Sequence, residues 1–178
     1  MKRIALLFIS FFVLASCLDS DKKDEALTLQ RKEYTGNNLR LDGFYYLKWI
    51  NDGVEEFYAI MFLYKNGINL GIGGGAPMSQ MDSYINQYTK NLNIKNIKGS
   101  WGVFEVDGND IILESWNSTQ LGYKVYHGEG KILNDTTFVI KESSKIVDGQ
   151  KTDVKKVNDV YHFKEFSPKP SSENDFIK

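Results

Sequence analysis

The sequence predicts a mainly β protein, built as an antiparallel up-and-down β-barrel of about eight strands with one α-helix between the third and fourth strands. Three observations indicate this fold class. Tyrosine and phenylalanine are abundant, with 10 and 11 residues, whereas proline occurs only 3 times, and this mixture favours strands. Short turn motifs separate apolar segments at regular intervals, and short connections join antiparallel neighbours. One segment alone changes to the periodicity of a helix.

Turn motifs with glycine mark the ends of several predicted strands. Asp52-Gly53, Gly108-Asn109 and Asp148-Gly149 are typical hairpin turns, because glycine tolerates a positive φ. An antiparallel sheet of this length has exposed edges unless it closes into a barrel, and an eight-stranded barrel holds its own side chains or one small ligand. The predicted strands cover residues 43–50, 55–64, 68–72, 100–106, 111–116, 122–133, 136–142 and 160–166.

The segment from Ser79 to Leu92 has the apolar pattern of a helix. Its apolar residues recur at offsets of three, four and seven, which places them on one helical face. Ser79 is a suitable N-cap, and Asp82 resembles the acidic half of a capping box. The strand over 57–64 is apolar on both faces, so we expect this helix to cover its outer face.

The first residues have the three parts of a secretory signal peptide. Two basic residues are followed by the apolar run Ile4–Ala15 and by small residues, which predicts a leader over residues 1–16. The apolar run has 12 residues, whereas a membrane-spanning helix needs about 20. The exit Leu14-Ala15-Ser16-Cys17 resembles the lipobox of bacterial lipoproteins. This resemblance implies lipidation of Cys17 and cleavage before it; the alternative is an ordinary leader followed by a free cysteine.

The lipid chains that the lipobox implies would anchor the protein to a membrane without crossing it. Leu18 after the cysteine is consistent with sorting to the outer membrane, and Asp19–Glu25 resembles the acidic export signal of surface lipoproteins in the Bacteroidetes. We therefore expect a lipid-anchored protein of the outer membrane, on its periplasmic face or at the cell surface.

Four regions follow from this organisation. They are the signal peptide (1–16), the lipidated cysteine with a flexible tether (17–40), the barrel (41–167) and a disordered tail (168–178). Removing the leader, which carries two positive charges and no negative one, changes the net charge from −1 to −3. A chain without a basic excess has no electrostatic basis for binding nucleic acid, so no nucleic-acid partner is expected.

Several segments resemble the lipocalin-like, or calycin-type, barrels of Bacteroidetes lipoproteins. They are "LDGFYY" at 41–46, the hairpin "WGVFEVDGNDIILESW" at 101–116, and "GKILNDTTFVI" leading to "YHFKEF". Gly43-Phe44-Tyr45 stands where lipocalins carry Gly-x-Trp, with Tyr45 in place of the tryptophan. The resemblance implies a barrel over roughly residues 41–166.

Aromatic residues on the predicted strands are the candidate ligand-binding residues. Aromatic faces stack on sugars or line an apolar cavity, and the alternative is that they fill the core. The candidates are Tyr45, Trp49, Trp101, Trp116 and Tyr126.

Other motifs indicate little chemistry. Gly71–Ala76 has the spacing of a dinucleotide-binding fingerprint, but no βαβ unit is predicted around it. The remaining interpretations of this segment are a bent strand end or a mobile loop at the barrel mouth. Neither His127 nor His162 has metal-ligand spacing, so we expect no metal and no cofactor. Glu129 could share a strand face with His127, as a solvated neighbour.

Three functions are consistent with these observations. The first is a non-catalytic, membrane-anchored binding module for a small apolar ligand or a glycan at the cell envelope. The alternative is a structural or protein-interaction subunit of an envelope complex, with a solid-packed barrel. The third is a hydrolase, which a buried histidine beside a carboxylate and a hydroxyl would support. We expect the protein not to be an enzyme.

Overall fold

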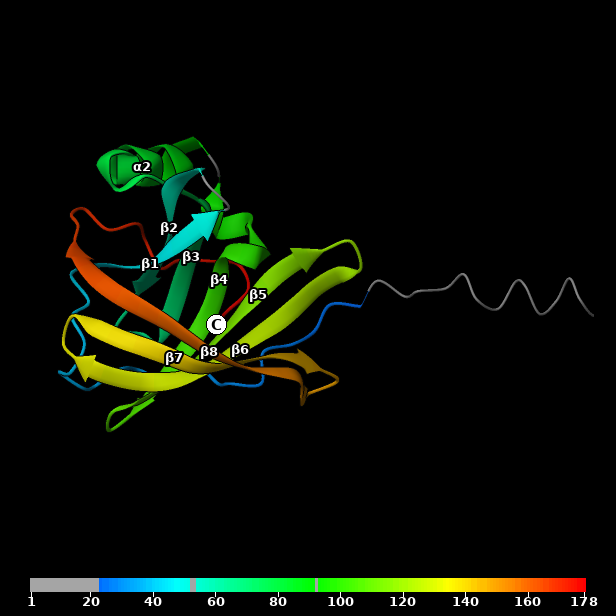
Figure 1. Cartoon of the computed structure of the whole chain (residues 1–178). Helices are drawn as coiled ribbons and strands as arrows, with labels where there is room; N and C mark the ends of the chain where they lie inside the picture. The colour runs from blue at the N-terminus through cyan, green and yellow to red at the C-terminus, as the bar shows by residue number, and fades with distance from the viewer. Residues whose placement is uncertain (1–22, 52–53, 92) are drawn as a thin grey trace, which may run out of the picture.

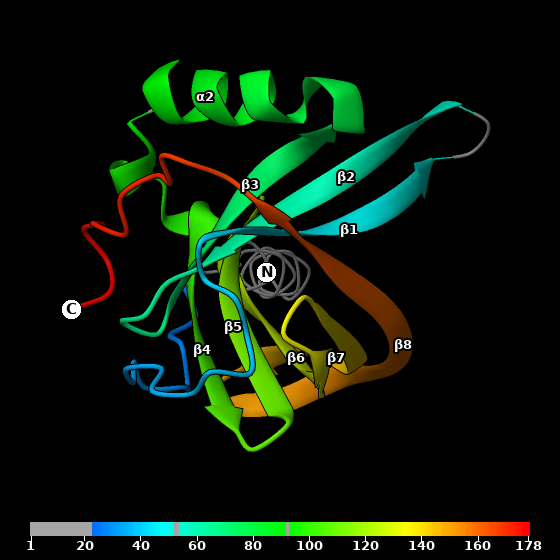
Figure 2. The same ribbon diagram turned by 90° about the vertical axis from the view of Figure 1, so that its left-hand side faces the viewer.

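The computed structural model describes residues 23–51, 54–91 and 93–178, which form a closed barrel of eight strands (Figure 1). Each strand pairs antiparallel with the next, and β8 pairs back with β1, which closes the ring (Figure 2). The predicted fold class is therefore confirmed. The strands are β1 (Gly43–Asn51), β2 (Val54–Leu63), β3 (Ile68–Ala76), β4 (Trp101–Asp107), β5 (Asp110–Thr119), β6 (Gly122–Asn134), β7 (Thr137–Val147) and β8 (Gln150–Glu165).

The α-helix of the described chain, α2 (Met81–Asn91), lies between β3 and β4, as predicted. It begins after Ser79, which instead belongs to a 3-10 turn, η2 (Met78–Gln80). Met81 and Ile85 are buried in one apolar cluster with residues of β2 and β3, so the helix covers the outer face of the barrel there (Figure 2). Among the residues described, no helix combines the length and the apolar character needed to cross a bilayer.

Several strands are longer than predicted, and β3 and β8 show why. β3 continues through the glycine run to Ala76, and Gly74 and Gly75 have φ angles of 87° and 136°, which favour glycine. The run is therefore the bent end of a strand. β8 begins at Gln150 rather than at residue 160, and residues 150–156 are all exposed. A strand segment that buries neither face has no apolar alternation to reveal it in the sequence.

Side chains that alternate along the strands form two separate apolar cores. The inner core includes Tyr45, Phe104, Leu113 and Phe138. The ring centroids of Tyr45 and Phe138 are 5.0 Å apart although β8 lies between their strands, so these side chains converge on the concave face of the sheet. The outer core lies on the convex face and buries Phe62 and Trp101, among others.

The two ends of the barrel differ. At the end that carries the β4–β5 and β6–β7 turns, which we call the closed end, Tyr34 and Leu39 are buried in the inner core. Towards the other end, two small residues share the inner face with Leu113: Gly128, the partner of Leu113 on β6, and Ser115, which lies two residues further along β5 and pairs with Tyr126. Both are partly exposed, so solvent reaches the inner face there. We call this end, which carries the β5–β6 and β7–β8 turns, the open end.

Residues 23–40 form an ordered strap, and the prediction of a flexible tether is wrong for them. The strap starts beside β6, where the Glu25 amide donates to the Tyr123 carbonyl at 2.9 Å. It ends at the closed end of the barrel, where the Tyr34 amide donates to the Lys65 carbonyl at 2.7 Å. Its contacts come from isolated backbone and polar groups and from a few single apolar side chains such as Tyr34 and Leu39, so they leave no periodic pattern in the sequence. Residues 1–22, which include the predicted leader and Cys17, lie outside the described residues.

The C-terminal tail, residues 168–178, is packed against the outer core, and the prediction of disorder is wrong. The Lys169 ammonium donates to the Leu63 carbonyl at 2.8 Å and lies over the Tyr64 ring, 4.4 Å from its centroid. Burial lowers the pKa of Lys169 to about 8. Further along, the Phe176 ring lies 6.3 Å from that of Trp116. A few apolar and cationic side chains therefore fasten a segment that has no regular secondary structure.

Candidate functional site

The four proposed ligand-site aromatics whose side chains the structure describes do not come together. Tyr45 is fully buried in the inner core, and its hydroxyl donates to two backbone carbonyls at 3.1 and 3.0 Å. Trp101 and Trp116 belong to the outer core, and each indole N–H donates to a backbone carbonyl at 2.9 Å. Tyr126 is 39% exposed near the open end, and the side chain of Trp49 is outside the described residues. Tyr45, Trp101 and Trp116 therefore fill the cores.

The glycine run at the end of β3 is held against α2. The Tyr84 hydroxyl donates to the Gly73 carbonyl, and the Gly75 amide donates to the Tyr84 hydroxyl at 3.3 Å. The strand after α2 is β4, which pairs antiparallel with β3. A dinucleotide site needs a parallel strand there, so the fold does not provide that context.

His127 lies in a buried polar cluster on the outer face of β5 and β6. Its Nδ1 is 2.9 Å from Glu114 Oε1, and its Nε2 is 2.9 Å from Glu129 Oε1. Glu114 is fully buried, and its carboxylate also accepts hydrogen bonds from the Thr28 and Leu29 amides of the strap, at 2.6 and 2.9 Å. The expectation that His127 is a solvated neighbour of Glu129 is thus wrong for the histidine, which is 5% exposed.

The pKa of Glu114 reflects two opposing effects. Burial by itself raises the pKa, but the hydrogen bonds from His127, Thr28 and Leu29 outweigh it and lower the pKa below its ordinary value of 4.5. The carboxylate therefore stays ionised and fastens the strap to the barrel.

Ser144 brings a hydroxyl close to this cluster without forming a nucleophile–base pair. It pairs with His127 across β6 and β7 and is 3% exposed. Its hydroxyl has no hydrogen-bond partner among the described residues, and His127 Nε2 is already occupied by Glu129. Activation of a serine requires a hydrogen bond to the base and access for substrate. The geometry of this cluster is therefore that of a structural fastening.

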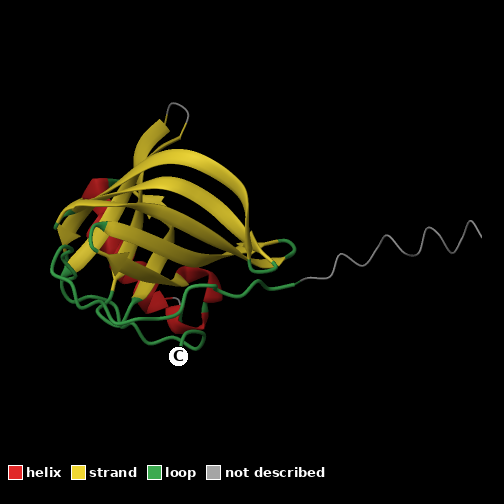
Figure 3. Cartoon of the chain, turned by 90° about the horizontal axis from the view of Figure 1, so that it is seen from below, coloured by secondary structure: helices red, strands yellow, loops and turns green. Residues whose placement is uncertain are grey.

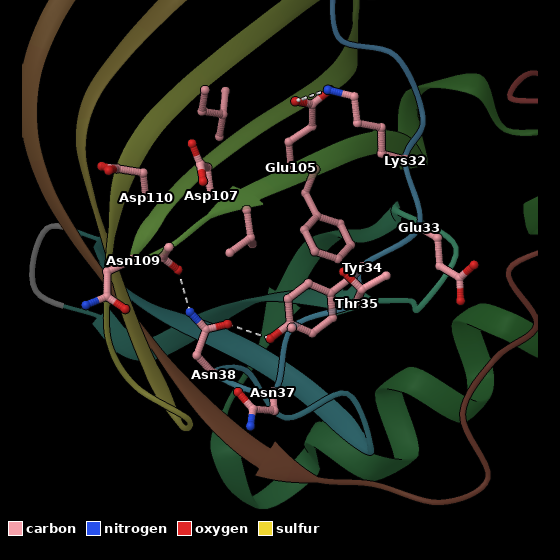
Figure 4. Close-up of a pocket in the computed structure, with 15 residues that line it drawn as sticks. Lys32, Glu33, Tyr34, Thr35, Asn37, Asn38, Glu105, Asp107, Asn109 and Asp110 are labelled. Atoms are coloured by element: carbon pink, nitrogen blue, oxygen red, sulfur yellow. Dashed lines mark hydrogen bonds and ion pairs between the residues drawn. The ribbon is translucent and has the colours of Figure 1, made fainter.

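A cleft of about 830 Å³ lies between the strap and the β4–β5 hairpin (Figure 4). One wall is residues 32–38 of the strap, and the other is residues 104–110 with Ile112. Asn38 joins the two walls at one end: its amide donates to the Gly108 carbonyl at 2.6 Å, and its carbonyl oxygen accepts from the Tyr34 hydroxyl at 2.7 Å. The volume is in the range of small-molecule sites.

The lining of the cleft combines an apolar floor with polar walls. Tyr34, Phe104, Val106 and Ile112 form the apolar part. Some of the charged groups are already paired; the Lys32 ammonium, for example, is 3.1 Å from Glu105. The remaining polar side chains make no hydrogen bond to another described side chain or backbone group; they are Thr35, Asn37, Asp107 and Asn109.

These free groups determine which ligands the cleft can accept. Carboxylates accept hydrogen bonds from hydroxyl groups, and an asparagine amide both donates and accepts. An apolar ligand would cover the Asp107 carboxylate without replacing its water, which is costly. The lining therefore favours a neutral, hydroxyl-rich ligand.

Sequence reasoning missed this cleft. Its strap wall was interpreted as a tether, and its hairpin wall only as a turn. The accumulation of Asn, Asp and Glu within 33–38 and 105–110 is the one signal that could have pointed to it. Which of these residues face each other depends on the path of the strap.

No three histidine, cysteine, aspartate or glutamate side chains in the described ranges are placed to share a metal ion. Comparison with known proteins adds no assignment, because no family model, no curated protein and no solved structure matches the chain.

Proposed function

We propose that this protein is a lipid-anchored lipoprotein of the outer membrane whose barrel is a non-catalytic module that binds a glycan in the cleft between the strap and the β4–β5 hairpin. The anchor rests on the lipobox Leu14–Cys17, which resembles that of bacterial lipoproteins. The binding role rests on one observation: a cleft of about 830 Å³ presents unpaired amide and carboxylate groups around an apolar floor. Of the two ligand classes expected from the sequence, this lining supports the glycan.

The binding role is tested with the domain from residue 23 onwards and a panel of glycans, using amide chemical shifts as the readout. A ligand in the cleft shifts the signals of Asn37, Asp107 and Asn109. The variant Asn109→Ala removes one side-chain partner, and we expect a loss of about 1 kcal/mol, or roughly fivefold in Kd. Asn86→Ala, on the exposed face of α2, is the matched control and leaves binding unchanged. Binding that is equal in the two variants would place the ligand elsewhere.

The anchor is tested separately in cells. Lipidation adds the mass of the acyl chains to the N-terminal peptide that begins at Cys17 and places the protein in the membrane fraction. The variant Cys17→Ala should move to the soluble fraction. A chain that sediments with membranes regardless of this substitution is not held there by lipidated Cys17.

A second function, a structural or protein-interaction subunit of an envelope complex, is favoured by the inner core. Aromatic side chains including Tyr45, Phe138 and Phe163 fill the closed end of the barrel, so no ligand fits there. Under this function, no glycan shifts the cleft signals, and the full-length protein migrates in a larger assembly after mild solubilisation of membranes.

A further inference from the structure

We propose that the open end of the barrel is a membrane-contacting surface, which lies against the bilayer that holds Cys17. This inference rests on the proposed lipid anchor and adds the orientation of the domain and the residues that contact lipid. It is drawn from the place where the described chain begins, the short distance to Cys17, and the exposed apolar side chains around the open end.

The described chain begins at the open end. Asp24 Oδ1 accepts a hydrogen bond from the Tyr123 amide at 2.9 Å, and Glu25 Oε2 accepts one from the Asp148 amide at 3.1 Å. Lys23 forms an ion pair with Asp148. These contacts fasten the start of the strap between the β5–β6 and β7–β8 turns, and Figure 1 shows the blue start of the described chain beside both hairpins.

The chain between Cys17 and Lys23 is too short to bring the other end of the barrel to the membrane. Six peptide units separate these residues, and a fully extended chain spans at most about 20 Å over that length. β6, with 13 residues, runs from the open end to the closed end and is about 40 Å long at the usual rise of a strand. A lipid on Cys17 therefore holds the open end, and not the β4–β5 and β6–β7 turns, near the bilayer.

The open end also carries most of the exposed large apolar side chains. Leu121 in the β5–β6 turn is 49% exposed, and Val147 before the β7–β8 turn is 38% exposed. Tyr126 and Val154, on the adjoining parts of β6 and β8, are 39% and 52% exposed. Of the five such side chains in the described residues, only Leu133 lies towards the closed end. Apolar and aromatic side chains beside a lipid surface bury their area in the headgroup region.

The charged side chains at the open end are largely paired with one another, and this pairing indicates which kind of lipid the surface contacts. Lys23 pairs with Asp148, Lys124 lies 3.7 Å from Glu25, and Lys145 lies 2.7 Å from Asp153. A surface whose lysines are matched by carboxylates attracts anionic lipid weakly. The partner is therefore the surface of a zwitterionic bilayer, contacted by apolar side chains.

The test supplies the anchor chemically, so that it does not depend on lipidation in the cell. Cys17 is the sole cysteine, so the chain from Cys17 onwards can be coupled through it to a maleimide phospholipid. This phospholipid is part of phosphatidylcholine nanodiscs, which also contain a trace of gadolinium-bearing lipid. The readout is paramagnetic broadening of backbone amide signals. We expect severalfold stronger broadening at Leu121 and Val147 than at Gly108, in the β4–β5 turn.

The double variant Leu121→Asn with Val147→Thr reduces this difference, whereas Leu133→Asn leaves it unchanged. All three side chains are exposed, so these variants keep the fold, which the amide spectrum checks directly. Broadening at Gly108 equal to that at Leu121, or a pattern that the double variant does not alter, would overturn the inference. If Cys17 carries no lipid in cells, the proposed anchor is wrong, whereas the nanodisc experiment still measures whether the open end contacts lipid.

Discussion

The contact between Glu114 and the strap leads to the prediction that the substitution Glu114→Gln releases residues 23–34 from the barrel. The Glu114 carboxylate is fully buried and accepts from the Thr28 amide and hydroxyl, the Leu29 amide and His127. Glutamine has nearly the same shape, but one of its two terminal atoms is an NH₂ group, which cannot accept.

The cost follows from the number of donors on each oxygen. Oε2 accepts from the Thr28 and Leu29 amides, and Oε1 accepts from the Thr28 hydroxyl and faces His127 Nδ1. With its NH₂ group in place of Oε2, the glutamine leaves both strap amides without an acceptor. With the NH₂ group in place of Oε1, the two amides keep a neutral acceptor and the Thr28 hydroxyl turns to accept, so this orientation is the less costly one. A hydrogen bond to a charged acceptor contributes about 1 kcal/mol more than one to a neutral acceptor, and the bonds of the two amides and of the hydroxyl all lose the charge, so we expect a loss of roughly 3 kcal/mol. For a chain of this size, that corresponds to a decrease in Tm of roughly 6–12 °C.

Thermal unfolding and amide hydrogen exchange measure this effect. The matched control is Glu105→Gln, because Glu105 pairs with Lys32, which is 67% exposed, and exposed pairs contribute at most about 1 kcal/mol. Exchange at the Thr28 and Leu29 amides should accelerate in Glu114→Gln alone. A decrease in Tm no larger than that of the control, with unchanged exchange at these two amides, would refute the reasoning.

The same carboxylate predicts how stability depends on acid. The pKa of Glu114 in the folded state is below its ordinary value of 4.5, so the unfolded chain binds the proton more readily than the folded one. Its contribution to stability is present above pH 4.5 and is lost as the pH falls through the lower folded-state pKa. The difference in free energy of unfolding between wild type and Glu114→Gln should therefore shrink in that acidic range, measured by denaturant titration.

Four further substitutions test the packing of the barrel and of the tail. Gly102→Ala should lower the free energy of unfolding by about 3 kcal/mol or more, because the added Cβ would collide with a backbone carbonyl of β5. Gly108→Ala should lower it by only about 1 kcal/mol, because Gly108 faces open space and only its φ of 56° disfavours alanine. Chemical denaturation of the two variants measures this difference. Trp101→Phe removes the indole hydrogen bond to the Ile94 carbonyl, which keeps the Ile97 amide as a donor, and should lower the free energy of unfolding by about 1 kcal/mol, seen as a lower Tm. Burial lowers the pKa of Lys169 from 10.5 to about 8, so the unfolded chain binds the proton more readily between these pH values. The free energy of unfolding of the wild type should therefore rise from pH 8 to pH 10.5, and this rise should be absent in Lys169→Met. A wild-type stability that does not change over this pH range would contradict the prediction.

Local patterns in the sequence were sufficient for most of the barrel. The turn at Gly108-Asn109, the hairpin partners on either side of it and the position of α2 were all predicted, because each depends on residues close together in the chain. The first half of β8 was missed, since residues 150–156 are exposed and show no apolar alternation.

The candidate site could not be predicted in the same way. The polar segment 23–40 has the composition of a tether, yet Glu114 and the Tyr123 and Lys65 backbones hold it against the barrel. The cleft exists only because this strap passes beside the β4–β5 hairpin. The aromatic residues chosen from the sequence were identified correctly as strand residues, but whether a strand residue faces a cavity or a core depends on what covers it.

The sequence by itself therefore determined the strand order, the antiparallel pairing and the place of the helix, because hydrophobic period and turn chemistry act over a few residues. Only the tertiary structure decided which face of each strand is inside, where the strap and tail lie, and which polar groups remain unpaired beside them. Those features depend on contacts between segments far apart in the chain, such as Thr28 with Glu114 and Phe176 with Trp116, and no local pattern encodes them.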